Sequence, residues 1–467
     1  MARLKSVYRC QECGHDEPKW AGQCSGCGAW NTLAEEAVEV RGAGAPPSGR
    51  APRPLTDFSA EAVPLASVKG AEEARRPTGL PEFDRLLGGG LVAGQVLLLA
   101  GPPGIGKSTL MLQVAHRLAS QAKVLYVTGE ESPSQVSGRA KRLGISGDGI
   151  LLMAETDLTK IVASIETHAP SYIVLDSVQT VYHPELAGGP GTVGQVRECA
   201  AELLRAAKAR GAVLFLLGHV TKDGAVAGPK VLEHLVDTVL QFDTERSGLL
   251  RLLRAEKNRF GPSNELGLFQ MEEKGLAGVE DAAAFFIEER AAVPGRAVSV
   301  ALEGSRPLLA EVQALVTPTR YPLPRRMATG LDLNRVLVLL AALEKHLHLR
   351  LETRDVYVSV AGGLRLRDPA LDLAVCMAVL SSAREEALPV DCVFVGEVGL
   401  LGRLGRVGSL AARLKEAERA GFKAALIPER SREDLGRSKG KLLLRPAADL
   451  AAAATLLADA PSVRENP

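Results

Sequence analysis

The chain has 467 residues, which is too long for a single hydrophobic core and predicts two or three domains. Hydrophobic residues make up 46% and charged residues 24%, and the net charge of +1 excludes a bulk electrostatic attraction to nucleic acid. No apolar run approaches the ~20 residues that span a bilayer, and the cysteine-rich start lacks the apolar core of a secretory signal, so we expect a cytoplasmic protein with reduced thiols and no membrane segment.

Four of the seven cysteines lie near the amino terminus in a C-x2-C-x10-C-x2-C pattern: Cys10, Cys13, Cys24 and Cys27. Two such turns can offer four thiolates to one tetrahedral Zn²⁺, and the glycines beside them tolerate a tight backbone. A redox pair is the alternative, but two paired turns at this spacing favour zinc in a reducing compartment. The pattern predicts a structural zinc ribbon over residues 1–34 and leaves open whether the ribbon contacts DNA or protein.

Three further segments follow the ribbon. Residues 35–62 include "RGAGAPPSGRAPRP", a composition typical of a flexible linker. Over residues 63–278, apolar strand runs such as "SYIVLDS" alternate with helical patterns such as "KSTLMLQVAHRLAS". This alternation predicts an α/β domain with a doubly wound, mainly parallel sheet and helices on both faces. The pattern then weakens, and we expect a separate α/β domain over residues 285–460.

The sequence "GPPGIGKST" fits the phosphate-loop pattern G-x-x-x-x-G-K-[ST]. It follows a predicted strand and opens a predicted helix, which is the context that the motif requires. Backbone N–H groups can cradle the β-phosphate at the helix start, Lys107 can reach the β- and γ-phosphates, and the Ser108 hydroxyl suits Mg²⁺. The motif predicts an ATP and Mg²⁺ site formed by Gly101, Pro102, Pro103, Gly104, Ile105, Gly106, Lys107, Ser108 and Thr109.

Polar side chains end three more predicted strands at the same sheet edge. Asp176 is predicted to hold Mg²⁺ through water, with a helix-capping role as the alternative. Either Glu130 or Glu131 can orient the attacking water as general base; Glu130 is preferred because it comes first after its strand, although paired carboxylates also often begin helices. His219, in "GHVTK", either senses the γ-phosphate or is an ordinary loop histidine.

Together these motifs resemble the RecA-type ATPase superfamily, and within it a family of bacterial DNA-repair proteins, over nearly the whole chain. The segments "GEES", "YIVLDS" and "GHVTKDG" fit that family, and its signature "KNRFG" is complete at Lys257, Asn258, Arg259, Phe260 and Gly261. One departure is Pro102, where relatives usually carry Asp, a side chain that the phosphate loop does not need.

The resemblance implies a DNA-dependent ATPase motor that binds single-stranded and branched DNA as a homohexameric ring. It implies branch migration and RecA-mediated strand exchange in double-strand break repair, at the nucleoid. The implied protein partners are the RecA recombinase and a replicative helicase or single-strand-binding protein.

The resemblance also implies roles for particular basic residues. Lys257 and Arg259 would enter the ATP site of the neighbouring subunit and stabilise charge on the γ-phosphate as arginine fingers do, with a DNA contact as the open alternative. DNA would lie along loops 182–198 and 221–230, which carry Arg197, Lys222 and Lys230. Without the resemblance these segments read as mobile loops, because neither has a dense basic run.

Residues 285–460 resemble the proteolytic domain of Lon through "GSRPLLAEVQALV" and "RDPALDLAVCMAVLSS". That mechanism needs a serine and a lysine, but the serine position holds Ala370 or Leu371, and Ala411 stands near the lysine position with Lys415 a turn further on. We therefore expect an inactive scaffold that promotes ring assembly, on which Arg325 and Arg326 of "TRYPLPRRM" bind DNA or are simply solvated. Two rival hypotheses are a Lon-type protease and a nucleotide-switched adaptor that is no motor.

Overall fold

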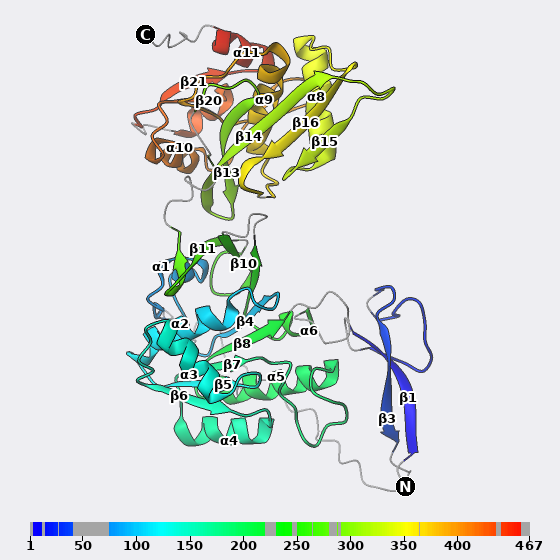
Figure 1. The fold of residues 1–467 in the computed structure, drawn as a ribbon, viewed down its shortest axis with the longest axis vertical. Coiled ribbons are helices and arrows are strands. Elements are labelled where there is room, and N and C mark those ends of the chain that lie inside the picture. The colour runs from blue at the N-terminus through cyan, green and yellow to red at the C-terminus, as the bar shows by residue number, and fades with distance from the viewer. Residues whose placement is uncertain are drawn as a thin grey trace, which may run out of the picture. The chain divides into compact units, whose positions relative to one another are not determined.

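The computed structural model describes residues 3–11, 15–26, 28–40, 74–219, 230–244, 250–263, 265–279, 287, 291–363, 365–435 and 440–458. By its internal contacts the chain divides into two compact units (Figure 1). The first consists of Met1–Thr244 with Leu249–Val279, and the second of Glu245–Gly248 with Glu280–Pro467. Within the described ranges, no helix combines the length and the apolar character needed to cross a bilayer.

The amino-terminal segment forms a small antiparallel sheet in the order β2-β1-β3. Its strands are β1 (Arg3–Cys10), β2 (Asp16–Glu17) and β3 (Leu33–Val40). Strand β3 continues beyond residue 34, where we expected the linker to begin, because its pairing with β1 runs on to the Arg3–Val40 pair. The rest of the predicted linker lies outside the described residues.

The first unit contains a nine-stranded sheet in the order β12-β11-β10-β9-β4-β8-β7-β5-β6. Six neighbouring strands of this sheet are parallel to one another: β9, β4, β8, β7, β5 and β6. Strands β10, β11 and β12 add an antiparallel extension beside β9. The expectation of a mainly parallel α/β sheet is confirmed. The strands are β4 (Val96–Gly101), β5 (Val124–Thr128), β6 (Ile150–Ala154), β7 (Tyr172–Asp176), β8 (Val213–His219), β9 (Thr238–Thr244), β10 (Leu250–Asn258), β11 (Leu266–Glu272) and β12 (Gly275–Gly278).

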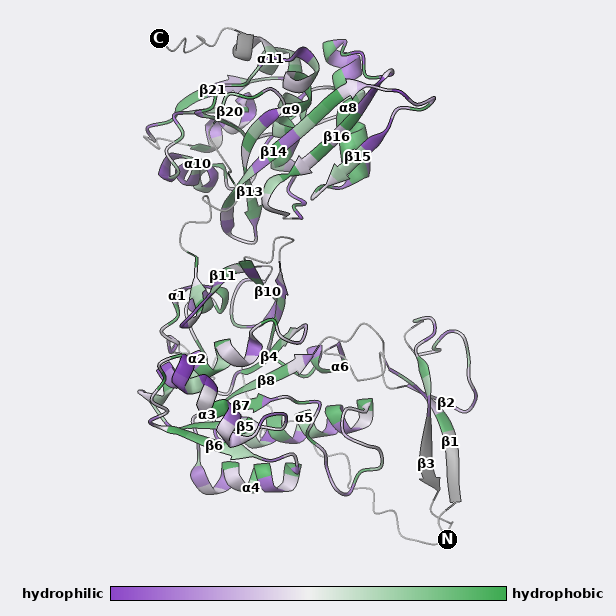
Figure 2. Ribbon diagram, in the orientation of Figure 1, coloured by the Kyte–Doolittle hydropathy of each residue, from purple (hydrophilic) through white to green (hydrophobic). Residues whose placement is uncertain are grey.

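Helices cover both faces of this sheet because successive strand residues point to opposite sides. Leu97 and Leu99 of β4 pack in one apolar cluster with α2 (Lys107–Ala119) and α3 (Pro133–Arg142). Val96 and Leu98 pack in the other cluster, with α4 (Leu158–His168), α5 (Val193–Lys208) and α6 (Lys230–Glu233). Short helix α1 (Pro81–Leu86) packs on the first face. Figure 2 shows α4 and α5 banded in hydrophilic and hydrophobic colours, as amphipathic surface helices are.

The second unit is also α/β, as predicted. Its seven-stranded sheet has the order β15-β16-β14-β13-β17-β20-β21, and β18 (Glu397–Val398) pairs separately with β19 (Leu404–Gly405). The sheet strands are β13 (Arg296–Glu303), β14 (Arg306–Pro318), β15 (Arg326–Thr329), β16 (Arg354–Val360), β17 (Cys392–Phe394), β20 (Ala424–Pro428) and β21 (Leu443–Ala447). The helices are α8 (Leu333–Leu347), α9 (Asp372–Arg384), α10 (Leu410–Arg419) and α11 (Leu450–Ala458). Helix α10 packs in one apolar cluster, and α8, α9 and α11 pack in another.

Candidate nucleotide site

The predicted phosphate loop joins β4 to α2, and its backbone depends on two glycines. Gly104 has φ +74° and Gly106, the residue that caps α2, has φ +119°, a region that residues with a side chain rarely adopt. A Cβ placed on Gly104 would meet nothing within 4 Å, so the loop is open on that side. The loop therefore presents N–H groups at a helix start to an anion such as a phosphate.

Lys107 is buried beneath this loop, with only 4% of its surface exposed. Its Nζ donates to the carbonyl oxygens of Gly101 at 2.8 Å and Pro102 at 3.0 Å, and it lies 3.0 Å from Nδ1 of His219. Burial lowers the pKa of Lys107 to about 8, although the nearby Asp176 and Glu130 carboxylates favour its charged form. The lysine is thus held in position by contacts that a phosphate could replace.

Glu130 faces Lys107, whereas Glu131 does not. One Glu130 oxygen lies 3.2 Å from Nε2 of His219 and also accepts a hydrogen bond from the Ser177 hydroxyl. The hydrogen bond with His219 is the largest cause that lowers the pKa of Glu130 to about 2. Glu131 instead forms an ion pair with Arg139 of α3 at 2.5 Å. The geometry therefore gives different partners to two carboxylates that are adjacent in the sequence.

Asp176 ends β7 beside Ser108, as the magnesium prediction requires. Its carboxylate is 6% exposed and accepts a hydrogen bond from the Tyr126 hydroxyl at 2.9 Å. Burial raises the pKa of Asp176, and hydrogen bonds from Ser108 and Tyr126 oppose that rise. A carboxylate beside a hydroxyl at a phosphate loop is a fitting oxygen set for Mg²⁺. Sequence reasoning missed Tyr126, which only strand pairing brings to Asp176, and also Ser177, although it directly follows that residue.

The "KNRFG" motif lies at the opposite edge of the sheet from the phosphate loop. Lys257 and Asn258 end β10 and pair with the first residues of β9, whereas the phosphate loop leaves the carboxyl end of β4. The backbone N–H of Arg259 donates to the Asp237 carbonyl, and Asp237 in turn donates to Val96 at the start of β4. Five residue-to-residue steps along the strand, roughly 16 Å, then separate Val96 from Gly101. The motif does not meet the phosphate loop of its own chain.

Contacts within the motif hold its two cations in place. Lys257 donates through Nζ to the carbonyls of Glu233 at 2.6 Å and Val236 at 2.9 Å. Arg259 pairs with the buried Asp237 at 3.3 Å, yet 57% of its side chain stays exposed.

The turn after these cations is equally constrained. Asn258 accepts a hydrogen bond from the Phe260 backbone at 3.1 Å. A Cβ on Gly261 would lie 2.8 Å from the Asn258 amide nitrogen and 3.1 Å from the Leu87 carbonyl, so a larger residue does not fit there without a shift.

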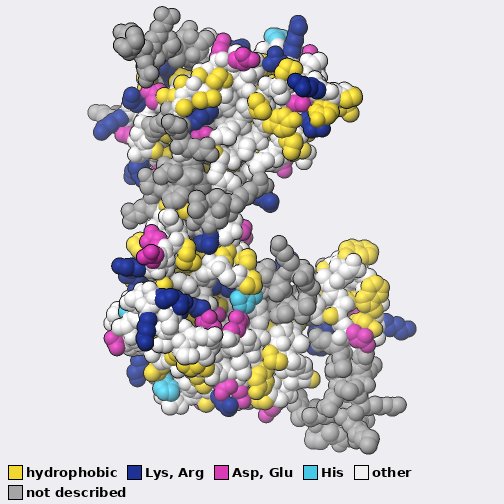
Figure 3. All heavy atoms as spheres, in the orientation of Figure 1, with side chains coloured by type: hydrophobic (Ala, Val, Ile, Leu, Met, Phe, Trp, Pro, Cys, Tyr) yellow, Lys and Arg dark blue, Asp and Glu magenta, His cyan; other side chains and the backbone are white. Residues whose placement is uncertain are grey.

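The residues predicted to bind DNA are dispersed. Arg197 is exposed on α5, Lys230 begins α6, and Lys222 lies outside the described residues. In the second unit, Arg325 is exposed and stacks over the Tyr321 ring at 3.6 Å. On the face drawn in Figure 3, lysine and arginine side chains are interspersed with acidic ones. On that face, the described residues form no dense basic patch that would mark a path for DNA.

Arg326 differs from Arg325 because its guanidinium is engaged by the main chain. It donates to the carbonyl oxygens of Arg354 at 2.5 Å, Leu351 at 2.7 Å and Arg325 at 3.1 Å. The contacts with Leu351 and Arg354 hold the start of β15 against the start of β16 and the residues just before it. Three of the five N–H donors of Arg326 are thus taken by main-chain carbonyls, and its role in DNA binding stays a prediction.

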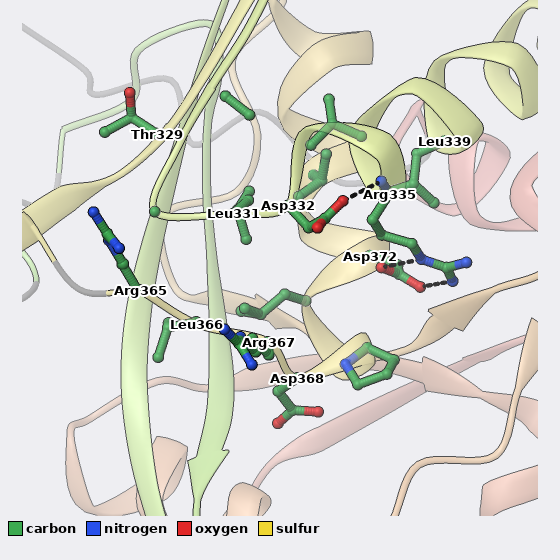
Figure 4. Close-up of a pocket in the computed structure, with 16 residues that line it drawn as sticks. Thr329, Leu331, Asp332, Arg335, Leu339, Arg365, Leu366, Arg367, Asp368 and Asp372 are labelled. Atoms are coloured by element: carbon green, nitrogen blue, oxygen red, sulfur yellow. Dashed lines mark hydrogen bonds and ion pairs between the residues drawn. The ribbon is translucent and has the colours of Figure 1, made fainter. Parts of the chain in front are cut away.

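The Lon-like unit has a cavity of about 820 Å³ next to the position where a catalytic serine would stand (Figure 4). Ala370 and Leu371 are buried there, and the cavity wall carries an ion pair between Arg335 and Asp372. Lys415 is exposed on α10 and lines a different cavity. At the positions where the Lon mechanism needs a serine and a lysine, this unit therefore has no serine next to a lysine.

The two serines of α9 are also occupied elsewhere. Ser381 accepts a hydrogen bond from the Gly295 backbone at 2.9 Å, and Ser382 accepts one from Val316 at 2.9 Å. Both lie at the carboxyl end of α9, away from the start of the helix where Leu371 caps it. They stabilise the packing of α9 against the sheet.

The ribbon brings two of its four cysteines together. Cys10 and Cys24 are buried in one small cluster with Leu33, while Cys13 and Cys27 lie outside the described residues. Three residues form the buried centre of this cluster, which is too little apolar surface to stabilise a fold alone. A metal held by the thiolates would supply the missing stability, so the residues present fit a structural Zn²⁺.

Known families match each part of the chain. A family described as an AAA domain matches residues 63–225, a rubredoxin metal-binding domain matches residues 8–35, and subunit ChlI of Mg-chelatase matches residues 335–431. The rubredoxin match spans all four predicted zinc ligands. Together with the phosphate loop on its mainly parallel sheet, these matches define a P-loop ATPase of the RecA-like class that carries a zinc ribbon and a Lon-like domain.

Full-length relatives narrow this class to one family. The chain is 48% identical to the DNA repair protein RadA of Bacillus subtilis (strain 168), over 94% of this chain and 96% of the relative. It is 50% identical to RadA of Pseudomonas aeruginosa and 47% identical to RadA of Aquifex aeolicus, each over 92% of this chain and 94% of the relative. The chain belongs to the RadA family of DNA repair proteins, as its motifs predicted.

Among solved structures, the KaiC-like protein PH0186 of Pyrococcus horikoshii OT3 is 19% identical and covers 44% of this chain and 99% of its own. The TM-score of 0.38 is too low to bear on the fold.

Proposed function

We propose that this protein is a DNA-dependent ATPase motor that works as a homohexameric ring on recombination intermediates. In this proposal it binds single-stranded and branched DNA at the nucleoid, drives branch migration and promotes RecA-mediated strand exchange in double-strand break repair. The RadA relatives, named as DNA repair proteins, support the process, and the phosphate loop supports ATP hydrolysis. The RecA recombinase and a replicative helicase or single-strand-binding protein are the proposed partners.

The position of Lys257 and Arg259 carries the proposal of a ring. These cations lie at the amino-terminal edge of the parallel strands, and their own phosphate loop lies at the carboxyl edge. In a ring where the amino-terminal edge of one subunit's sheet faces the carboxyl edge of the next subunit's sheet, Lys257 and Arg259 would reach the neighbour's γ-phosphate. Such a finger is worth ~10³-fold or more in rate, so hydrolysis would depend on subunit contact.

Within one subunit, each polar group has a distinct proposed role in hydrolysis. Lys107 exchanges its carbonyl and His219 contacts for the β- and γ-phosphates, and its charge offsets theirs. Glu130 stays ionised because its pKa is lowered to about 2, and it orients the attacking water. Ser108 and Asp176 would hold Mg²⁺, which supplies charge neutralisation on the phosphates when bound.

Two rival functions find less support. A Lon-type protease would need a serine where buried Ala370 and Leu371 stand, and the exposed Lys415 does not share their cavity. A nucleotide-switched adaptor would bind ATP with turnover that is indifferent to DNA, and the "KNRFG" cations would then have no role in rate.

The decisive experiment compares ATPase rates with and without single-stranded DNA for the wild type, Lys257→Ala and a control, Lys423→Ala. Lys423 is 81% exposed in the second unit and contacts Asp391 only at 3.8 Å. We expect DNA to stimulate the wild type and the control, and Lys257→Ala to lose ~10³-fold in rate in both conditions. A loss confined to the reaction with DNA would instead assign Lys257 to DNA binding, and equal rates in all samples would exclude the motor.

A further inference from the structure

The chain contains two tryptophans, and both stand exposed on the amino-terminal ribbon. Trp20 is 59% exposed and Trp30 is 69% exposed. Tryptophan is usually well buried, because leaving so large an apolar side chain in water is costly. Two exposed indoles in so small a segment therefore indicate a contact surface rather than a core.

The two indoles lie close to one another across Gly22. A Cβ built on Gly22 would lie 3.6 Å from Cζ3 of Trp30 and 4.0 Å from Cη2 of Trp20. The six-membered rings of both tryptophans thus approach the same backbone position. Because glycine has no side chain, nothing from Gly22 covers the ring surfaces that approach it.

Backbone hydrogen bonds present this pair on a fixed loop. Residues 23 and 30 form an antiparallel bridge, and the Cys24 N–H donates to the Ala29 carbonyl at 2.9 Å. The Asn31 N–H donates to the Gly22 carbonyl at 2.8 Å. The loop also carries Cys24, one of the buried predicted zinc ligands. Binding of a partner to the indoles would therefore cost little conformational entropy in the backbone beneath them.

The surroundings of the pair favour an unpaired nucleic acid over a protein. Lys19, Gln23 and Asn31 are exposed beside the indoles, and among residues 7–11, 15, 17–26 and 28–35, whose side chains the structure describes, no other large hydrophobic side chain is exposed. A protein interface of ordinary size has a continuous apolar core, which one pair of rings bordered by polar side chains does not provide. Base stacking needs only aromatic faces and a nearby cation for the phosphates, and every base offers a flat face.

We propose that Trp20 and Trp30 form a stacking platform for unpaired bases of single-stranded DNA, with Lys19 beside its phosphates. This inference rests on the proposed function in DNA repair and assigns the ribbon a direct part in holding the strand. It makes the zinc ribbon a DNA contact instead of a docking module for another protein.

The intrinsic fluorescence of the two tryptophans can be used to test this proposal. Because they are the chain's two tryptophans, selective excitation of the full-length protein monitors this surface alone. We expect a thymidine oligonucleotide to quench their emission in a saturable manner. With a labelled oligonucleotide, Trp20→Ala and Trp30→Ala should each weaken binding by about 5- to 100-fold, and Trp→Phe at either position should lose less, since phenylalanine still stacks.

Three controls make the outcome decisive. The zinc content of each variant shows whether the ribbon remains folded, and Leu401→Ala removes another hydrophobic side chain, 81% exposed, from the second unit without a predicted effect. Lys107→Ala should keep the quenching, which separates this platform from the ATPase. The inference would be overturned if tryptophan emission did not change on addition of DNA, or if the two alanine variants bound DNA with wild-type affinity. Either result would favour a protein partner for the ribbon, even if DNA still stimulated ATP hydrolysis. Quenching without any DNA stimulation of the ATPase would support the platform and contradict the motor.

Discussion

The side-chain amide of Gln179 exchanges two hydrogen bonds with the main chain of His219. Its Nε2 donates to the His219 carbonyl at 2.9 Å, and the His219 N–H donates to its Oε1 at 3.0 Å. The imidazole then bridges Lys107 and Glu130. A lysine ammonium only donates and a carboxylate only accepts, so the ring accepts at Nδ1 and donates from Nε2. Gln179 thereby positions the His219 imidazole between the two groups proposed to handle the γ-phosphate and the water.

We predict that Gln179→Ala lowers kcat for ATP hydrolysis by about tenfold and leaves KM for ATP nearly unchanged, because it displaces His219 without touching the phosphate loop. Steady-state ATPase assays measure both constants. Gln179→Glu, which can still accept from the His219 N–H, should fall between alanine and wild type. A rise in KM at constant kcat would show that Gln179 acts on nucleotide binding instead.

The lowered pKa of Lys107 predicts that ATP affinity decreases as the pH rises above about 8. Below that pH the lysine already carries its charge, and above it ATP must bind together with a proton, which costs up to ~10-fold in Kd per pH unit. Glu130 adds no titration in this range, since its pKa is lowered to about 2. Nucleotide titrations between pH 7 and 9.5, and calorimetry in two buffers of different ionisation enthalpy, would detect the proton uptake.

The control for this pH dependence is Glu131→Gln. Glu131 pairs with Arg139 and not with Lys107, so the variant should keep the wild-type profile. A flat profile in the wild type would mean that Lys107 remains fully charged in the nucleotide-free protein.

Fingers supplied in trans predict complementation between two inactive variants. Lys107→Ala lacks a working phosphate loop but retains Lys257, and Lys257→Ala has the reverse defect. In randomly mixed rings, about a quarter of the interfaces would combine an intact loop with an intact finger, so the mixture should recover about a quarter of the wild-type rate. Each variant alone should stay near the background. No recovery after the two variants have been unfolded and refolded together would place the lysine's action within its own subunit.

Loss of a ribbon cysteine should remove the metal and leave the nucleotide site intact. We predict that Cys24→Ser lowers the zinc content from about one per chain to near zero and unfolds the ribbon, because its few apolar residues cannot hold it without a metal. Metal analysis and ATP titration of the same sample test both parts. Cys199→Ser, in the core of the ATPase domain, should keep its zinc. Full zinc retention in Cys24→Ser would contradict the four-cysteine site.

Local sequence motifs were sufficient to predict those parts of the site that are formed by residues close together in the chain. The phosphate loop, the carboxylate at the end of β7 and the spacing of the cysteines each lie within a short segment, and the backbone of such a segment is largely dictated by its own glycines and side chains. The alternation of strands and helices likewise predicted a mainly parallel sheet in the first unit. It did not predict the antiparallel extension by β10, β11 and β12, whose order in the sheet no local pattern encodes.

Relations between distant segments were decided by the tertiary structure alone. Glu130 and Glu131 are adjacent in sequence, yet only the packing of α3, which supplies Arg139, and the approach of His219 turn them in different directions. Gln179 carries no motif, and its role depends on the pairing that places the end of β7 beside β8. The edge at which Lys257 and Arg259 lie follows from the antiparallel direction of β10, and the approach of Trp20 to Trp30 follows from a bridge across the ribbon loop. The physical reason is the same in each case: spacing along the chain determines which groups a turn or a helix start presents, whereas strand order and register determine which of those groups meet.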